Sequence, residues 1–332
     1  MKISIKKIII PSIPSAIFLL GCCVVLWAFS YFSIDLNQSV EQSGPKFVPF
    51  DKYFVENSLL ANLLCIVLSL LNAFLLEQLS TKYSLIRTRT FLPIFNYVLL
   101  MAVWSLAGIT FSNHIALTFL IVSLFNFMNM YRDKQAVEKA FTGSLTTGIA
   151  GFFSFEFMLL LPAFWIGFVM FQSFSLRTFL ASVFGAITPW ILYFSVRLYF
   201  QPDGIWFDYI LSHLDTGFVL KVPSIHLIIY IASLFIILLI GLTGLYNNLQ
   251  SDSIQTRQSI KIFVVLFFTS LIIAFIFSAY STVLLPLIAL SYSMIISHPL
   301  SLQKNNFYSI LFIVFCTINI FYVLMNYFFS IQ

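Results

Sequence analysis

Charge is scarce in this chain. Only 9% of its 332 residues are charged, whereas soluble domains carry about 25%. The hydrophobic share is 60% and the mean hydropathy is +0.99, which is more apolar surface than a soluble core of this size can bury. The composition therefore excludes an ordinary soluble domain and indicates that lipid surrounds much of the chain.

Familiar chemical motifs are also missing. The sequence has no CxxC, HExxH, GxGxxG or Walker pattern. Its basic residues are scattered at the ends of apolar segments instead of forming one basic face, which argues against nucleic acid as a partner. The cysteines lie inside apolar runs and are interpreted as buried hydrophobic side chains: Cys22, Cys23, Cys65 and Cys316. The sequence thus predicts no metal site and identifies no cofactor.

Long apolar runs are what the chain has in abundance. About 20 apolar residues cross the hydrocarbon core of a bilayer as a helix. This rule predicts an all-α, polytopic transmembrane helix bundle, a single integral-membrane domain over residues 1–332 whose main partner is the lipid bilayer. About eleven spans are expected, at residues 12–34, 58–76, 91–109, 115–131, 140–155, 157–175, 178–197, 225–243, 262–279, 283–298 and 307–328.

The distribution of basic residues predicts the orientation. Lys2, Lys6 and Lys7 precede the first apolar run as in a signal peptide, but that run continues without a polar break, so an uncleaved span with a cytoplasmic N-terminus is expected. Alternating from there leaves 13 of the 17 basic residues inside, as the positive-inside rule requires. Four of the 12 acidic residues lie inside.

The predicted topology depends most on how the stretch 131–189 crosses the membrane. A span of residues 140–155 reaches only about 24 Å, and a re-entrant segment there would leave 11 basic residues inside and six outside, so a full span is favoured. Small residues recur every fourth position in two rows, which predicts close helix packing: Gly143, Thr147 and Gly151, then Ala140, Ser144 and Gly148. Kinks are expected at Pro162, Pro189 and Pro286.

Two long extracytoplasmic loops are predicted, at residues 35–57 and 199–224. The first carries four carboxylates, of which Asp35 and Asp51 are the best candidates for a general base because each lies close to a span or an aromatic residue. The same carboxylates would also suit a divalent cation, or the loop could simply be solvated.

The second loop and the span before it hold the other candidates. Arg197 lies near the outer end of its span, on the side with net negative charge, where a guanidinium can bind a phosphate or pyrophosphate. Its alternative role is to extend to the interface beside the lipid head groups. Asp208 and His213 in the loop are further candidates for substrate contact, although their spacing matches no known catalytic pattern.

The block at 131–192, which opens on YRDKQAVEKAF and ends on GAITPWIL, resembles an uncharacterised family of multispanning inner-membrane proteins from the Bacteroidota. The resemblance rests on the EKAF motif at 138–141, the glycine-rich segment after it, Arg177, the Gly185-to-Pro189 pattern and the segment TRTFLPIFNYVLL at 88–100. It implies a location in the bacterial inner membrane and no particular activity.

The layout is similar, more distantly, to the integral-membrane C-class glycosyltransferases (GT-C), which have a cytoplasmic N-terminus, one span and then an acidic outer loop. Residues 35–57 occupy the position of that catalytic loop, although they contain no Asp-x-Asp or Glu-x-Asp pair. The similarity implies transfer of a sugar from a polyprenyl-linked donor in envelope glycan assembly, with Asp35 or Asp51 as the base. A non-catalytic scaffold or partner subunit is the alternative, and a transporter or flippase is less favoured because the charges lie at span ends.

Overall fold

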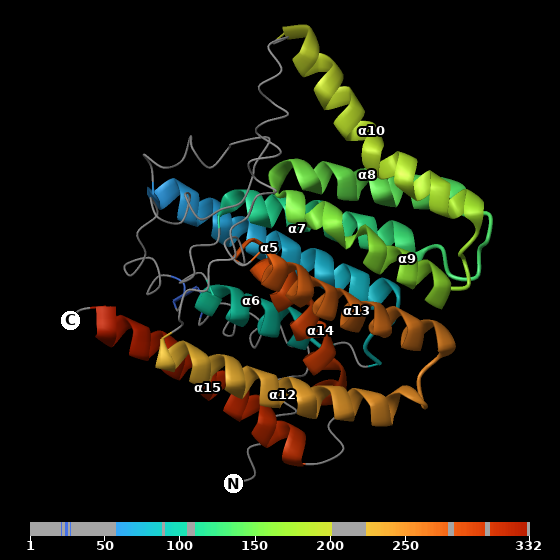
Figure 1. The fold of residues 1–332 in the computed structure, drawn as a ribbon. Helices are drawn as coiled ribbons and strands as arrows, with labels where there is room; N and C mark the ends of the chain where they lie inside the picture. The colour runs from blue at the N-terminus through green and yellow to red at the C-terminus, as the bar shows by residue number, and fades with distance from the viewer. Residues whose placement is uncertain are drawn as a thin grey trace.

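The computed structural model describes residues 21, 24, 25, 27, 58–87, 90–104, 110–200, 224–277, 282–302 and 306–330. In these ranges the chain is helical, with no strand. The helices are α5 (Ser58–Lys82), α6 (Leu92–Trp104), α7 (Phe111–Met128), α8 (Val137–Phe153), η2 (Phe155–Leu160), α9 (Leu161–Met170), α10 (Leu176–Phe200), α12 (Ile225–Leu249), α13 (Ile254–Ile276), α14 (Leu285–Leu302) and α15 (Asn306–Ser330). They pack side by side as a bundle (Figure 1).

Seven of the described helices are long and apolar enough to cross a membrane, namely those that contain α5, α7, α10, α12, α13, α14 and α15. This confirms the prediction of a helical, multi-pass membrane protein. The expected spans at 91–109, 140–155 and 157–175 correspond to the shorter elements α6, α8 and η2 with α9. The expected span at 12–34 lies largely outside the described residues, so the total of eleven stays a prediction.

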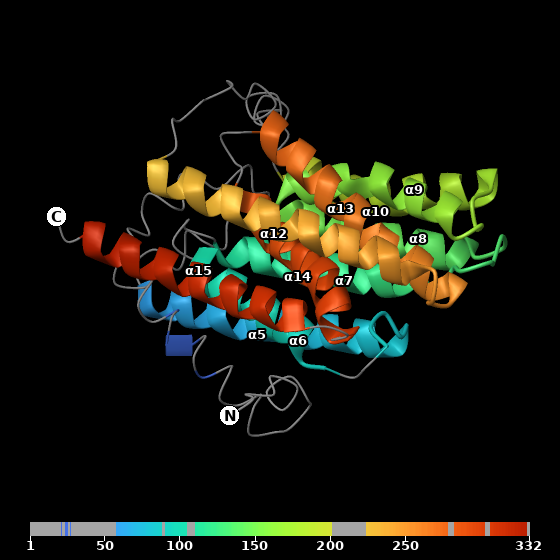
Figure 2. The same ribbon diagram turned by 90° about the horizontal axis from the view of Figure 1, so that it is seen from below.

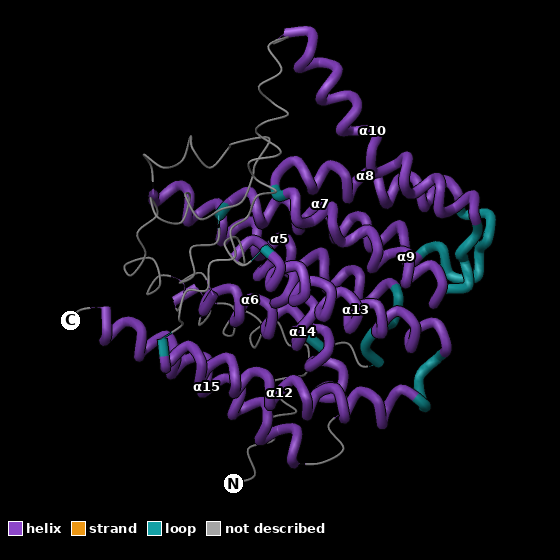
Figure 3. Tube along the Cα trace, viewed as in Figure 1, coloured by secondary structure: helices purple, strands orange, loops and turns teal. Residues whose placement is uncertain are grey.

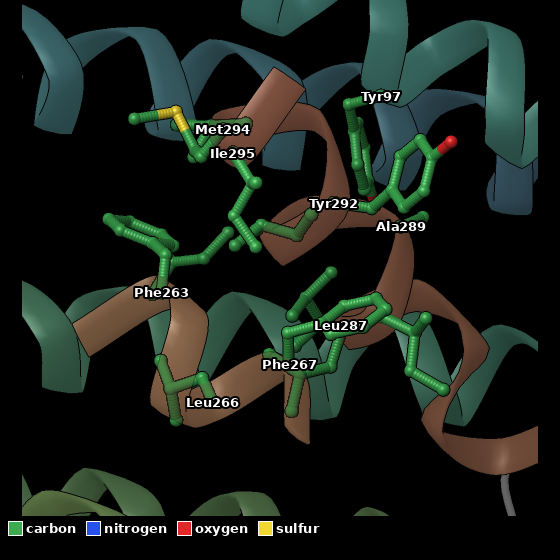
Figure 4. Close-up of a cluster of buried hydrophobic side chains, with 14 of the residues drawn as sticks. Tyr97, Phe263, Leu266, Phe267, Leu287, Ala289, Tyr292, Met294 and Ile295 are labelled. Carbon is green, nitrogen blue, oxygen red and sulfur yellow. The ribbon is translucent and has the colours of Figure 1, made fainter. Parts of the chain in front are cut away.

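Helix α14 forms the centre of the bundle. In its membrane-length segment 94% of the residues are buried, against 28% for α5, α10, α12 and α15. Figure 4 shows how Phe263, Leu266 and Phe267 of α13 face Leu287 and Ile295 of α14. The helices with few buried residues therefore surround α14 and present apolar side chains outward, as a bundle in lipid does.

Helix α8 packs tightly between α7 and α10, as the two rows of small residues predict. A methyl group added at Gly143 would lie 2.6 Å from the ring of Phe127 in α7, and one added at Gly148 would lie 2.4 Å from the carbonyl oxygen of Ala186 in α10. A methyl group added at Gly185 of α10 would likewise overlap the carbonyl oxygen of Phe141 in α8. The glycines therefore have a packing role, which confirms that prediction.

Two of the three prolines that were expected to kink their helices lie near the start of an α-helix, directly after a short 3-10 segment. Pro162 lies in the first turn of α9, and Pro286 is the second residue of α14. A proline in the first turn costs nothing, because the N–H that it lacks would have no partner there. Pro189 does lie inside α10, and the helix changes direction along its length (Figure 1).

The turns that follow α5, α7, α9 and α12 gather at one end of the bundle, which we call the connector end. The turn after α5 contacts α7 through Tyr83, whose hydroxyl donates to the carbonyl of Phe125 at 2.8 Å. Burial raises the pKa of Tyr83 to about 12, so that hydroxyl stays protonated. The turns at 129–136 and 171–175 meet where the Arg132 N–H donates to the Phe171 carbonyl at 2.9 Å. Figure 3 shows these connections together at the right.

The opposite end, which we call the loop end, contains the start of α5, the end of α10 and the start of α12 (Figure 1). Each of these helices has 25 residues and is therefore about 37 Å long, and the other terminus of each lies at the connector end. The loops predicted at 35–57 and 199–224 are consequently attached to the same end of the bundle. The structure also gives α8 and η2 with α9 opposite directions, which agrees with a full crossing at 140–155.

Candidate functional site

Of the five site residues predicted from the sequence, Arg197 alone lies in the described ranges. Asp35, Asp51, Asp208 and His213 lie outside them, so their roles stay predictions. Arg197 is in the last turn of α10. Its Nη1 donates to the Tyr193 hydroxyl at 3.0 Å, and the guanidinium carbon lies 6.0 Å from the centre of that ring. The side chain is half-buried and remains in contact with the surface at the loop end.

An aromatic band lies one to two turns below Arg197. Trp190 and Tyr193 of α10 contact Phe152 at the end of α8, with ring centroids 4.9 and 5.3 Å apart. Phe155 of η2 meets Trp190 edge-on at 5.9 Å. Tryptophan and tyrosine concentrate at the level of the lipid head groups, so this band is expected to mark the outer interface with Arg197 just beyond it.

Buried polar groups lie close to this band in the loop-end half of the bundle. Ser154, between α8 and η2, donates to Asn113 Oδ1 at 2.9 Å. Asn72 of α5 donates to the His114 carbonyl at 3.0 Å and accepts from Thr118 at 2.8 Å. Glu156, one residue into η2, is 2% exposed. The fold buries this carboxylate because η2 turns its first residues into the bundle.

A second polar cluster lies at the connector end and was not foreseen. Asp252, in the turn between α12 and α13, accepts from Arg87 Nε at 2.5 Å and lies 3.0 Å from His298 Nε2. The side chains of Asp252 and His298 are each 1% exposed, and that of Arg87 is 35% exposed. We call these three residues the inner cluster. It joins the turn after α5, the turn before α13 and the end of α14.

The inner cluster continues into the bundle through hydroxyl and amide groups. Asn96 of α6 donates to the Ser297 hydroxyl of α14 at 2.9 Å, next to His298. Within the described part of the chain, His298 Nδ1 makes no hydrogen bond. The one signal in the sequence was a histidine inside a predicted span, which is rare in membrane helices, but its partners are 46 and more residues away.

An open cavity of about 510 Å³ lies between α12 and α15. These helices run side by side in Figures 1 and 2. We call it the α12/α15 groove; Ile229, Tyr230 and Ser233 line it from α12, and Thr317, Phe321 and Tyr322 from α15. Tyr230 and Tyr322 stack with centroids 4.0 Å apart. The Tyr230 hydroxyl accepts from Trp104 Nε1 at 3.0 Å and donates to Asn319 Oδ1 at 2.8 Å.

Among the described residues, no three histidine, cysteine, aspartate or glutamate side chains come together as a metal site would need. The described residues offer hydrogen-bonding groups, the Arg197 guanidinium at the loop end, the charged groups of the inner cluster, the buried Glu156 carboxylate and an apolar groove. Comparison of the chain with protein-family models, curated proteins and solved structures finds no match.

Proposed function

We propose that this chain is an integral inner-membrane enzyme that transfers a sugar from a polyprenyl-linked donor at the outer face during envelope glycan assembly. One observation carries the proposal, namely that both acidic loops are attached to the loop end, where Arg197 also lies. In the proposed function, a loop carboxylate and the Arg197 guanidinium act on the same side of the membrane, one as the base and the other as the phosphate contact. The similarity of layout to the C-class glycosyltransferases supports the same assignment.

The proposed reaction uses two charged groups, a loop carboxylate as the base and the Arg197 guanidinium as the phosphate contact. Asp35 or Asp51 takes the proton of the acceptor hydroxyl, which then attacks the anomeric carbon of the donor. The bond from that carbon to the phosphate oxygen breaks, and polyprenyl phosphate leaves with the bonding electrons. Arg197 stabilises the negative charge of the departing phosphate. Its bond to Tyr193 uses one of the five N–H donors of a guanidinium. Asp208 and His213 lie in the adjoining loop and are proposed to contact the sugar.

The test uses proteoliposomes that contain the full chain and a panel of radiolabelled polyprenyl phosphate sugars. The expected result is acceptor-dependent release of polyprenyl phosphate, lost at least 100-fold in Asp35→Asn or in Asp51→Asn, because general-base catalysis contributes about 10²–10⁴-fold. Glu41→Gln, in the same loop, is the matched control and should stay active. If Asp35→Asn and Asp51→Asn both transfer sugar at the wild-type rate, the assignment of the base is wrong.

A non-catalytic partner subunit is the second candidate, and the outer half of α10 favours it. This part of the helix extends away from the bundle in Figure 1. Its apolar side chains Ile191, Leu192 and Val196 are 57%, 62% and 58% exposed, so a helix of another membrane protein has room to pack there. In this case Val196→Trp should prevent co-purification of the partner, while all substitutions of the loop acids leave it intact.

A further inference from the structure

We propose that the α12/α15 groove binds one acyl chain of a phospholipid from the outer leaflet. This site is independent of the sugar transfer proposed above and does not use its residues. Both helices that form the groove are long enough to cross the bilayer, and only 28% of each membrane-length segment is buried. The opening between them therefore faces the hydrocarbon core of the bilayer, so a lipid acyl chain is the ligand that surrounds it.

The groove offers a hydrocarbon surface although several of its residues are polar. The Ser233 hydroxyl donates to the carbonyl of Tyr230 at 2.7 Å, and the Thr317 hydroxyl donates to that of Val314 at 3.0 Å. The Tyr230 hydroxyl is bonded to Trp104 and Asn319 inside the bundle. Because these groups are satisfied by the protein, the groove gives a polar ligand little to bind. It suits an apolar chain.

The side chains also give the groove its depth and rigidity. Ser233 and Thr317 are short, and they lie on facing helices. The stacked rings of Tyr230 and Tyr322 form a wall that the two hydrogen bonds of Tyr230 hold in place. A preformed apolar groove binds a chain without the cost of ordering its own side chains.

The length and position of the groove match one leaflet. Its lining on α12 begins at His226, in the first turn of that helix at the loop end, and its lining on α15 runs from Thr317 to Met325. Eight helical steps cover about 12 Å, and one leaflet contributes about 15 Å of hydrocarbon. A phospholipid chain therefore fits along the groove with its head group near His226, whereas a polyprenyl chain is several times longer than the groove.

The volume argues against a protein helix as the occupant. A helix with its side chains is about 10–12 Å wide and would fill about 900–1,400 Å³ over 12 Å of length. The groove measures about 510 Å³. A single hydrocarbon chain enters this space without moving α12 from α15.

The experiment uses the full chain in proteoliposomes with phosphatidylethanolamine that carries a photoreactive diazirine halfway along one acyl chain. After irradiation, peptides that contain residues 226–233 and 317–325 should be labelled at least fivefold more than the lipid-exposed peptides of α10. Thr317→Trp fills the groove and should reduce this labelling at least fivefold. Ile236→Trp is the matched control, because Ile236 is 58% exposed on α12 and does not line the groove; its labelling should equal that of the wild type.

Three results would overturn the proposal. Labelling of the groove peptides no stronger than that of α10 would mean ordinary contact with surrounding lipid. Labelling that persists in both Thr317→Trp and Ser233→Phe would place the acyl chain outside the groove. Ser233→Phe is included in case Thr317→Trp does not fold. Loss of labelling when an equal mole fraction of polyprenyl phosphate is added would make that lipid the occupant of the groove. A failure to detect sugar transfer, with labelling of the groove peptides unchanged, would contradict the proposed function and leave the acyl-chain site intact.

Discussion

Asp252→Ala should destabilise the protein far more than its position in a short turn suggests. The carboxylate is 1% exposed and is held by Arg87 and His298. Removing one member of a buried ion pair costs about 3–5 kcal/mol, because the charge left behind has no partner. Since the Arg87 side chain is 35% exposed and can reach water, we expect the lower end, about 3 kcal/mol.

The matched control is Asp133→Ala at the same end of the bundle. Asp133 lies 3.4 Å from Lys139, and both side chains are 43% exposed. An exposed pair of this kind contributes about 0–1 kcal/mol. The two Asp→Ala changes remove the same atoms, so the difference in cost measures the effect of burial.

The assay is unfolding of the detergent-solubilised protein by titration with sodium dodecyl sulfate, followed by far-ultraviolet circular dichroism. A double-mutant cycle with Asp252→Ala and His298→Ala should give a coupling energy of about 0.5–3 kcal/mol, as contacting residues do. If Asp252→Ala unfolds within about 0.5 kcal/mol of Asp133→Ala, or if the two changes in the cycle are additive, the inner cluster does not hold the three segments together.

Two further variants test the packing with the same titration. Gly148→Ala should lower the free energy of unfolding by about 1–3 kcal/mol relative to Gly167→Ala. The added methyl group at Gly148 meets a backbone carbonyl of α10 at 2.4 Å, whereas the one at Gly167 meets the end of a flexible side chain at 3.2 Å. Equal stabilities of the two variants would contradict the tight contact. Tyr230→Phe should cost about 1–3 kcal/mol, because it leaves Asn319 and Trp104 without their hydroxyl partner, and an unchanged midpoint would show that these bonds contribute nothing.

The sequence predicted most of the helices because apolar runs of membrane length are visible without any tertiary information. It also predicted the close packing of α8, since glycines four residues apart mark one helix face. The positions of Pro162 and Pro286 near the starts of α9 and α14 were not visible in the sequence, because each follows a short 3-10 segment that continues the same apolar run.

The inner cluster and the groove were beyond prediction for another reason. Asp252 and His298 each lack a local pattern, and they meet only because α14 packs against the turn between α12 and α13. Ser233 and Thr317 form a groove only because α12 and α15 lie beside each other. Such sites depend on which helices are neighbours, and hydrophobic periodicity does not carry that information.

The shared side of the two long loops is the central claim, and labelling of cysteines in intact cells tests it most directly. Cys22, Cys23, Cys65 and Cys316 are replaced by alanine, and single cysteines are introduced as Ser39→Cys, Ser212→Cys, Gln135→Cys and Ser251→Cys. A membrane-impermeant maleimide should label the first two variants in intact cells and the last two only after the cells are opened. Labelling of Ser39→Cys and Ser212→Cys from opposite sides would contradict the account.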